Sequence, residues 1–201
     1  LYDPSEITFY YYEGEAHYRS GNNAEAIRVL QRGADRVDEN TDPQLASDVL
    51  ALLGDVLHDS HLTEEAYLAY DRSLEYNPLN LFCLNNYAYF LSVEGKKLDK
   101  AEGMSRRTVE VEPQNATYLD TYAWILFKLG RYREAQISME EALRYTPETE
   151  ENVSIFDHAG DIYYYCGKKD RAPEFWKKAL QLTSDKAQKR LLQRKIRQRK
   201  P

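Results

Sequence analysis

The sequence has few of the residues and motifs that mark enzymes, metalloproteins and disulfide-stabilised domains. Its 201 residues include two cysteines and four histidines. It contains no phosphate-binding glycine loop, no Gly-x-Ser-x-Gly and no His-Glu-x-x-His motif. No apolar run approaches the roughly 20 residues of a membrane-spanning helix. We therefore predict a protein without a transmembrane segment that is not an enzyme and that needs no metal or other cofactor.

The composition is that of a globular protein, but its charge is unevenly distributed. The net charge is −6, whereas residues 185–201 hold eight Lys or Arg against one Asp. An acidic body repels phosphates, so nucleic acid is not an expected partner. The sequence begins with Leu1 rather than Met, and we expect a piece of a longer protein. The sequence does not decide the cellular compartment of the protein. It is the cytoplasm or, if an export signal was removed, the cell envelope.

An alanine and a proline recur together along the chain. In three places an alanine precedes a proline by 12 residues, and the prolines are 35 and 34 residues apart: Ala66 and Pro78, Ala101 and Pro113, Ala135 and Pro147. Proline cannot continue a helix, so each proline marks the end of a unit. The period predicts a chain built from one repeated supersecondary unit.

Each unit has the pattern of two amphipathic helices around a turn. In residues 116–149, apolar side chains recur at steps of three and four residues on both sides of Gly130. Small residues such as Ala123 and Ala135 leave room where two antiparallel helices approach each other. Further units with the same pattern precede and follow the three units that end in proline.

This pattern resembles the tetratricopeptide repeat, a helix-turn-helix unit of 34 residues. The general character of the sequence resembles that of bacterial members of the family. The resemblance implies an all-α, right-handed superhelical solenoid whose first helices line a concave face. It predicts one domain over 1–201, with repeats at about 7–40, 47–80, 81–115, 116–149 and 153–184. Short insertions at 41–46 and 150–152 are interpreted as longer loops and not as domain boundaries. A capping helix is expected over 185–200, begun by Asp185.

The apolar stripe of this last helix is predicted to be Ala187, Leu191 and Ile196, with Leu192 beside it. We interpret the basic residues as the polar outer side of a cap, which a repeat array needs at its end. The alternative is a basic arm for a membrane surface or an acidic partner.

The resemblance also implies which first-helix positions face the concave groove. The groove residues are predicted to be Tyr11, Tyr12, Glu15, Tyr18, Asp55, Asn86, Tyr89, Asp120, Trp124, Asp157, Asp161 and Tyr164. Such acidic and aromatic side chains favour Lys- or Arg-bearing peptides through ionic and cation–π contacts. Alternatively, the acids are solvated helix residues and the aromatics belong to the core. Members of the family that clamp carboxylate tails need basic groove residues, and only Asn86 matches that clamp.

We therefore predict a non-enzymatic scaffold that binds a partner protein or peptide in this groove. Two alternatives stay open: a self-assembling array and an accessory subunit of a cell-envelope complex. Asp55, His58, Asp59 and His61 are also a candidate metal site, because three of them share a helix face. The simpler interpretation is that the two histidines are exposed at a helix end.

Overall fold

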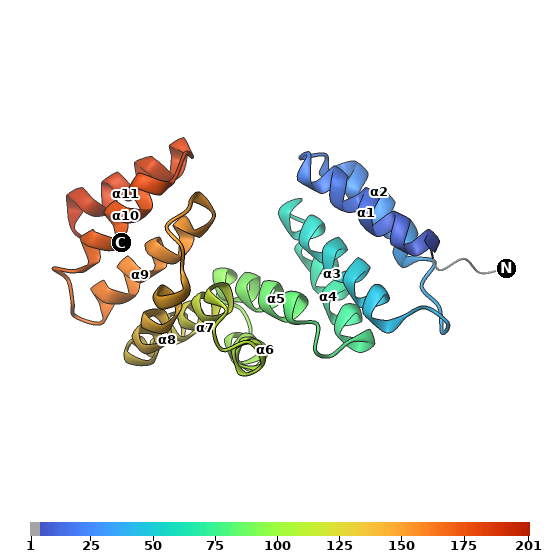
Figure 1. Ribbon diagram of the computed structural model, residues 1–201, viewed down its shortest axis with the longest axis horizontal. Coiled ribbons are helices and arrows are strands. Elements are labelled where there is room, and N and C mark those ends of the chain that lie inside the picture. The colour runs from blue at the N-terminus through green and yellow to red at the C-terminus, as the bar shows by residue number, and fades with distance from the viewer. Residues whose placement is uncertain (1–4) are drawn as a thin grey trace. The chain divides into compact units, whose positions relative to one another are not determined.

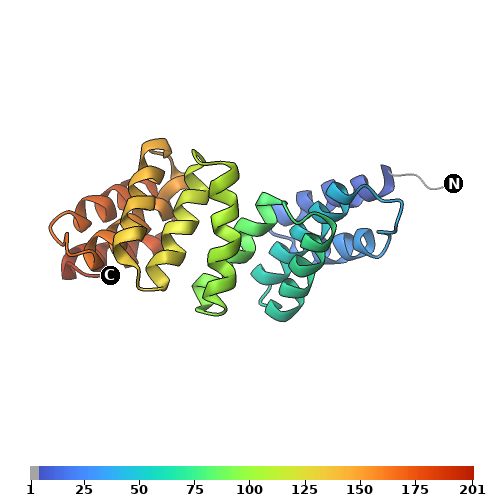
Figure 2. The ribbon, with the colours of Figure 1, turned by 90° about the horizontal axis from the view of Figure 1, so that it is seen from below.

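The structure is a computed structural model that describes residues 5–201, so residues 1–4 of the predicted domain lie outside the described part. The described chain is helical, and α1 with α2, α3 with α4, α7 with α8 and α9 with α10 form packed pairs of consecutive helices (Figures 1 and 2). The predicted all-α class is confirmed. The elements are α1 (Ser5–Arg19), α2 (Asn23–Ala34), α3 (Pro43–Asp59), α4 (Thr63–Tyr76), α5 (Leu81–Glu94), α6 (Leu98–Val111), α7 (Ala116–Lys128), α8 (Tyr132–Tyr145), η1 (Glu150–Asn152), α9 (Val153–Tyr165), α10 (Ala172–Leu182) and α11 (Lys186–Gln198).

The helices end and begin where the local chemistry dictates. α4, α6 and α8 each end two residues before a proline, as the recurrence predicted. The backbone N–H of Gln188 donates to Asp185 Oδ1 at 2.6 Å, which confirms the expected N-cap of α11. The loop predicted at 41–46 is shorter than expected, because Asp42 caps α3 and Pro43 opens its first turn.

The chain forms two compact units, one that ends at Tyr87 and one that comprises Ala88–Pro201. The division falls inside α5. In the first unit α1 packs on α2 and on α3, and α3 packs on α4. In the second, α7 packs on α8 and on α9, and α9 packs on α10. Within each unit a first helix thus contacts both its own second helix and the next first helix. The organisation as a single domain stays a prediction.

Small residues in the first helices allow large residues of the second helices to pack closely. A Cβ atom added to Gly54 would lie 2.6 Å from the Tyr70 ring, and one added to Gly160 would lie 2.2 Å from Trp176 Nε1. Both pairs are 16 residues apart, and Tyr70 and Trp176 are fully buried. The same spacing joins Ala123 to Met139, which share a core cluster. At Gly54 and Gly160 the aromatic ring of the second helix leaves no room for a Cβ atom, whereas Met139 packs near an alanine.

This packing predicts opposite effects for two glycine-to-alanine substitutions. Gly160→Ala should lower the free energy of unfolding by about 1–3 kcal/mol, because the new methyl group displaces the Trp176 ring. Gly103→Ala should raise it by roughly 0.5–1 kcal/mol, because Gly103 is exposed within α6 and an added Cβ meets nothing within 4 Å. Urea unfolding monitored by circular dichroism measures both. Equal effects of the two substitutions would refute the close approach at Gly160.

Candidate partner-binding face

Asp55 is predicted to face a partner, but in the structure it forms hydrogen bonds within the first unit. It lies in α3, is 5% exposed, and accepts hydrogen bonds from Tyr70 on α4 and from Asn86 on α5. The Asn86 Nδ2 to Asp55 Oδ2 distance is 2.9 Å. Burial raises the pKa of Asp55 to about 7, against the lowering effect of these two donors. Asp55 therefore joins three helices and has little surface left for a ligand.

Asp161 repeats this arrangement in the second unit. Its Oδ1 accepts a hydrogen bond from Trp176 Nε1 at 2.9 Å, as Asp55 accepts one from Tyr70. Lys195 Nζ of α11 lies 2.8 Å from Asp161 Oδ1 and 2.6 Å from Asp157 Oδ1. Burial raises the pKa of Asp161, although Lys195 opposes the shift. Two acids of the predicted groove are thus bridged by a lysine of the capping helix.

Asp120 is also paired within the second unit. It is 6% exposed on α7, and both of its oxygens lie within 3.1 Å of His158 Nδ1 on α9. Burial alone would lower the pKa of His158, but the Asp120 carboxylate more than compensates and the pKa is raised. The pair holds neighbouring first helices together and fixes the orientation of the imidazole ring.

The remaining predicted residues of the first unit lie on α1. The Tyr18 hydroxyl donates to Asp59 Oδ2 at 2.6 Å, and Glu15 forms an ion pair with Arg19 one turn away. Tyr11 and Tyr12 are in edge-to-face contact, with ring centroids 5.3 Å apart. Tyr12 is 62% exposed, and Tyr11 is half-buried. In this unit the two tyrosine rings are more accessible than the carboxylate of Asp55.

In the second unit, a run of aromatic rings in stacked and edge-to-face contact lies partly exposed beside the paired carboxylates. We call it the aromatic ladder, and it consists of Trp124, Phe127, Tyr132, Tyr164 and Tyr165. Its ring centroids are 4.9 Å apart for Trp124 and Phe127, 5.3 Å for Phe127 and Tyr165, and 5.4 Å for Tyr132 and Tyr165. Tyr165 is 49% exposed, and the other four rings are half-buried.

Trp124 joins the ladder to the paired carboxylates. Its indole ring stacks on His158 at 4.0 Å between centroids, and the centroid of the Tyr89 ring lies 6.3 Å from that of His158. Burial and the carboxylates of Asp120 and Asp157 raise the pKa of Tyr89, so its hydroxyl stays neutral. The Trp124 Nε1 atom is buried without a hydrogen-bond acceptor among the described residues.

The first-helix positions of the resemblance also place Phe127, His158 and Tyr165 on the concave side, whereas Lys195 and Tyr132 lie outside the predicted set. The sequence holds a signal for Lys195. The predicted stripe of α11 was wrong, because Ala187 and Leu191 are exposed, whereas Leu192 and Lys195 are buried and Ile196 is half-buried. Leu192 and Lys195 are three residues apart and share one face. A lysine on the inward face of a cap, opposite Asp157 and Asp161, indicates an internal ion pair.

The candidate metal site at Asp55, His58, Asp59 and His61 has no support in the described residues. No group of three or more His, Cys, Asp or Glu side chains among them is arranged to hold a metal ion. His61 lies in the turn between α3 and α4 with a φ of 63°, the left-handed conformation that Gly130 adopts in the corresponding turn between α7 and α8. His61 therefore occupies a turn position.

Comparisons with known proteins agree with the fold and with one repeat in particular. Residues 116–149 match the family model of the tetratricopeptide repeat. MamA from Desulfovibrio magneticus RS-1, from residue 41 to its end, has a similar structure: the TM-score is 0.69 at 19% identity, over 88% of this chain and 94% of that one. MamA AMB-1 gives 0.62 at 23% identity, over 90% and 93% of the two chains. PilF from Pseudomonas aeruginosa gives 0.73 at 19% identity, over 97% and 87%. No curated protein matches the sequence.

Residues 116–149 are therefore a tetratricopeptide repeat, and the chain as a whole shares the helical-repeat fold of these structures, as the Ala–Pro recurrence predicted. The structural neighbours fit the bacterial origin that the sequence suggested. Repeats of this family commonly present a surface to other proteins, so the fold points to a protein-interaction scaffold. None of the described helices has the length and apolar character needed to cross a bilayer.

The buried Asp55 carboxyl predicts a pH-dependent stability that Asp55→Asn removes. Its pKa is about 7 in the folded chain and about 3.9 in an unfolded one. Between these values the folded chain retains a proton that the unfolded chain has lost, so this group lowers stability as pH rises from about 4 to about 7. The asparagine does not titrate, and its oxygen can still accept from Tyr70.

Urea unfolding at several pH values gives the unfolding free energies of the wild type and of Asp55→Asn. The contributions of groups that titrate in both proteins cancel in the difference. The stability of wild type relative to Asp55→Asn should fall by about 2 kcal/mol or more between pH 4 and pH 7.5. A difference that does not change with pH would show that Asp55 is not a buried acid.

Proposed function

We propose that the protein is a non-enzymatic scaffold whose second unit binds an extended segment of a partner protein on the aromatic ladder. The observation that carries the proposal is the exposed ring of Tyr165 in contact with the half-buried rings of the ladder, which together form an aromatic surface. Aromatic rings contribute large contact areas with little loss of conformational freedom, so they are common centres of interfaces.

The proposal also refines the chemistry of the partner. The sequence predicted a Lys/Arg-rich segment attracted by groove carboxylates, but Asp120, Asp157 and Asp161 already have internal partners. Lysines of the chain itself lie over two ladder rings, with Lys128 Nζ 5.8 Å from Trp124 and Lys169 Nζ 5.0 Å from Tyr164. We therefore expect a segment rich in apolar and aromatic side chains, with basic side chains limited to the rim of the ladder.

A peptide selection against the purified protein provides the probe, and Trp124→Ala tests the site. Selected peptides should bind this variant at least about tenfold more weakly, because the variant loses the indole surface of the ladder. The matched control is Tyr145→Ala, which removes another exposed ring from α8, outside the ladder. Circular dichroism checks that both variants keep their helices.

Two results would contradict the proposal. One is equal binding of the peptides by Trp124→Ala and by the wild-type protein. The other is an affinity that falls steeply with salt for Lys/Arg-rich peptides only, which would restore the carboxylates as the main determinants. A weak dependence on salt together with the loss of binding in Trp124→Ala supports the aromatic ladder.

A further inference from the structure

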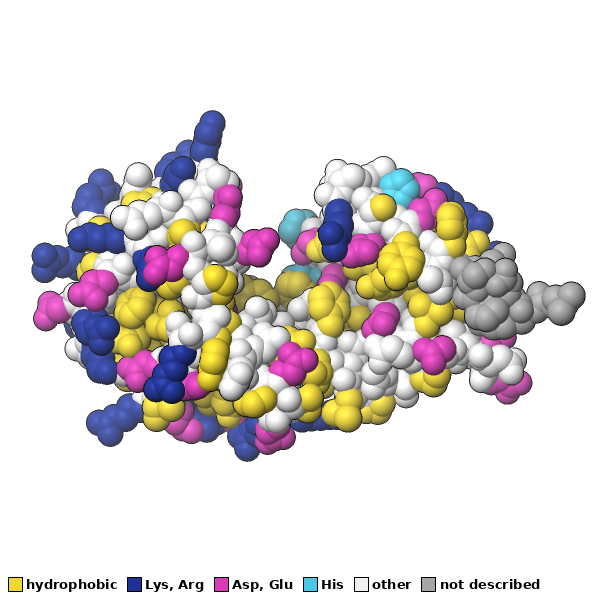
Figure 3. All heavy atoms as spheres, in the orientation of Figure 1, with side chains coloured by type: hydrophobic (Ala, Val, Ile, Leu, Met, Phe, Trp, Pro, Cys, Tyr) yellow, Lys and Arg dark blue, Asp and Glu magenta, His cyan; other side chains and the backbone are white. Residues whose placement is uncertain are grey.

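The two compact units carry charges of opposite sign. Residues 1–87 contain 16 Asp or Glu, five Arg and no Lys, which gives a net charge of −11. Residues 88–201 contain 17 Asp or Glu and 22 Lys or Arg, which gives +5. Figure 3 shows Lys and Arg side chains gathered over the C-terminal helices. A chain with this division carries surfaces that attract one another when two copies meet.

The basic surface is concentrated on the outer face of α11. Arg190, Arg194 and Arg197 are exposed at steps of four and three residues, and Leu191 beside them is 37% exposed. These residues line a shallow depression. None of the three arginines forms an ion pair with another described residue. The face therefore combines unpaired positive charge with one accessible leucine.

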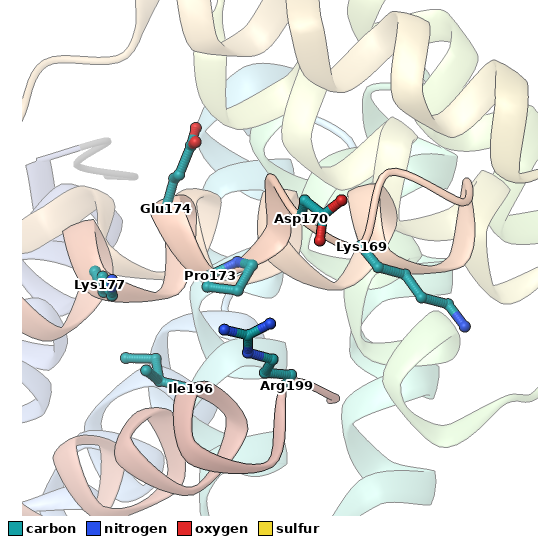
Figure 4. Close-up of a pocket in the computed structure, with 7 residues that line it drawn as sticks. All are labelled: Lys169, Asp170, Pro173, Glu174, Lys177, Ile196 and Arg199. Carbon is teal, nitrogen blue, oxygen red and sulfur yellow. The ribbon is translucent and has the colours of Figure 1, made fainter.

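The neighbouring hollow between α10 and the end of α11 is of a different kind. It contains Lys169, Lys177 and Arg199, but also Asp170 and Glu174. In Figure 4 Arg199 points towards α10, and Glu174 points away from the hollow. Its charges are mixed, so the surface of one sign is confined to the outer face of α11.

A complementary face lies on α4 in the acidic unit. Glu64, Leu68 and Glu75 lie on one side of this helix, at steps of four and seven residues, and Asp71 lies between the last two. Leu68 is 66% exposed and lines a depression with side chains of α2 and α3. Arg72 is the basic residue of the helix, so α4 carries four acids against one base. The α11 face presents an exposed leucine among arginines, and the α4 face presents an exposed leucine among four acids and one base, Arg72, which lines the same depression as Leu68.

We propose that the outer face of α11 binds the outer face of α4 of a second copy of this chain. Leu191 and Leu68 would meet at the centre, and the arginines of α11 would lie against the carboxylates of α4. A membrane is less well matched, because the apolar side of α11 is already covered: Leu192 is buried and Ile196 packs against the core cluster of α9 and α10. The two faces differ, so the contact is heterologous and copies add head to tail. This contact does not involve the aromatic ladder.

Sedimentation velocity over a concentration series tests the contact. The wild-type protein should gain mass with concentration at about 50 mM salt and lose this gain at about 500 mM, where surface charges are screened. Arg190→Glu with Arg194→Glu should weaken the association at least about tenfold. Glu64→Arg with Glu75→Arg should do the same from the other side. The matched control is Arg133→Glu with Arg144→Glu on α8, which makes the same change of charge elsewhere and should leave association unchanged.

Reciprocal charge reversal identifies the two faces as partners. Each reversed variant alone should stay monomeric, whereas an equimolar mixture of the two should recover the mass increase, because the reversed α11 of one variant fits the reversed α4 of the other. Circular dichroism establishes that every variant is folded.

Three results would overturn the proposal. The first is a wild-type protein that stays monomeric at every concentration, whether or not it binds vesicles that contain phosphatidylserine. The second is association that survives reversal of α11. The third is a mixture of the two reversed variants that does not associate.

Discussion

The close contact between a small residue of each first helix and a large residue 16 positions later constrains the rest of the structure. At Gly54 and Gly160 the contact leaves no room for a methyl group, because the rings of Tyr70 and Trp176 lie against the helix backbone. A large buried ring brings its polar atom into the core, and that atom needs an acceptor. The residue after each glycine, Asp55 or Asp161, supplies it.

These packing requirements determine which polar side chains the first helices carry. A carboxylate that accepts from a buried ring is itself partly desolvated, so it needs a second donor. Asn86 provides that donor to Asp55, and Lys195 provides it to Asp161. Acids that resemble a ligand-binding surface in the sequence therefore contribute to the packing of consecutive helices. The aromatic ladder is left as the accessible part of the face in the second unit.

The helical repeats could be predicted from the sequence because proline, alanine and glycine act locally. Pro78 ends its helix wherever the rest of the chain lies, and Ala123 fits a close helix contact in any tetratricopeptide repeat. The roles of the acids could not be predicted in this way, since Asp161 depends on Lys195, 34 residues away. The inward face of α11 was predicted wrongly because Leu191 and Leu192 are adjacent, and hydropathy alone does not distinguish them.

The claim that first-helix carboxylates serve the fold is tested most directly by the coupling between Asp161 and Lys195. Unfolding free energies of the wild type, Asp161→Asn, Lys195→Met and the double variant form a double-mutant cycle. The buried ion pair predicts that Lys195→Met alone is strongly destabilising, because it leaves Asp157 and Asp161 unpaired, and that the two substitutions couple by about 1–3 kcal/mol. Additivity to within about 0.5 kcal/mol would contradict the claim.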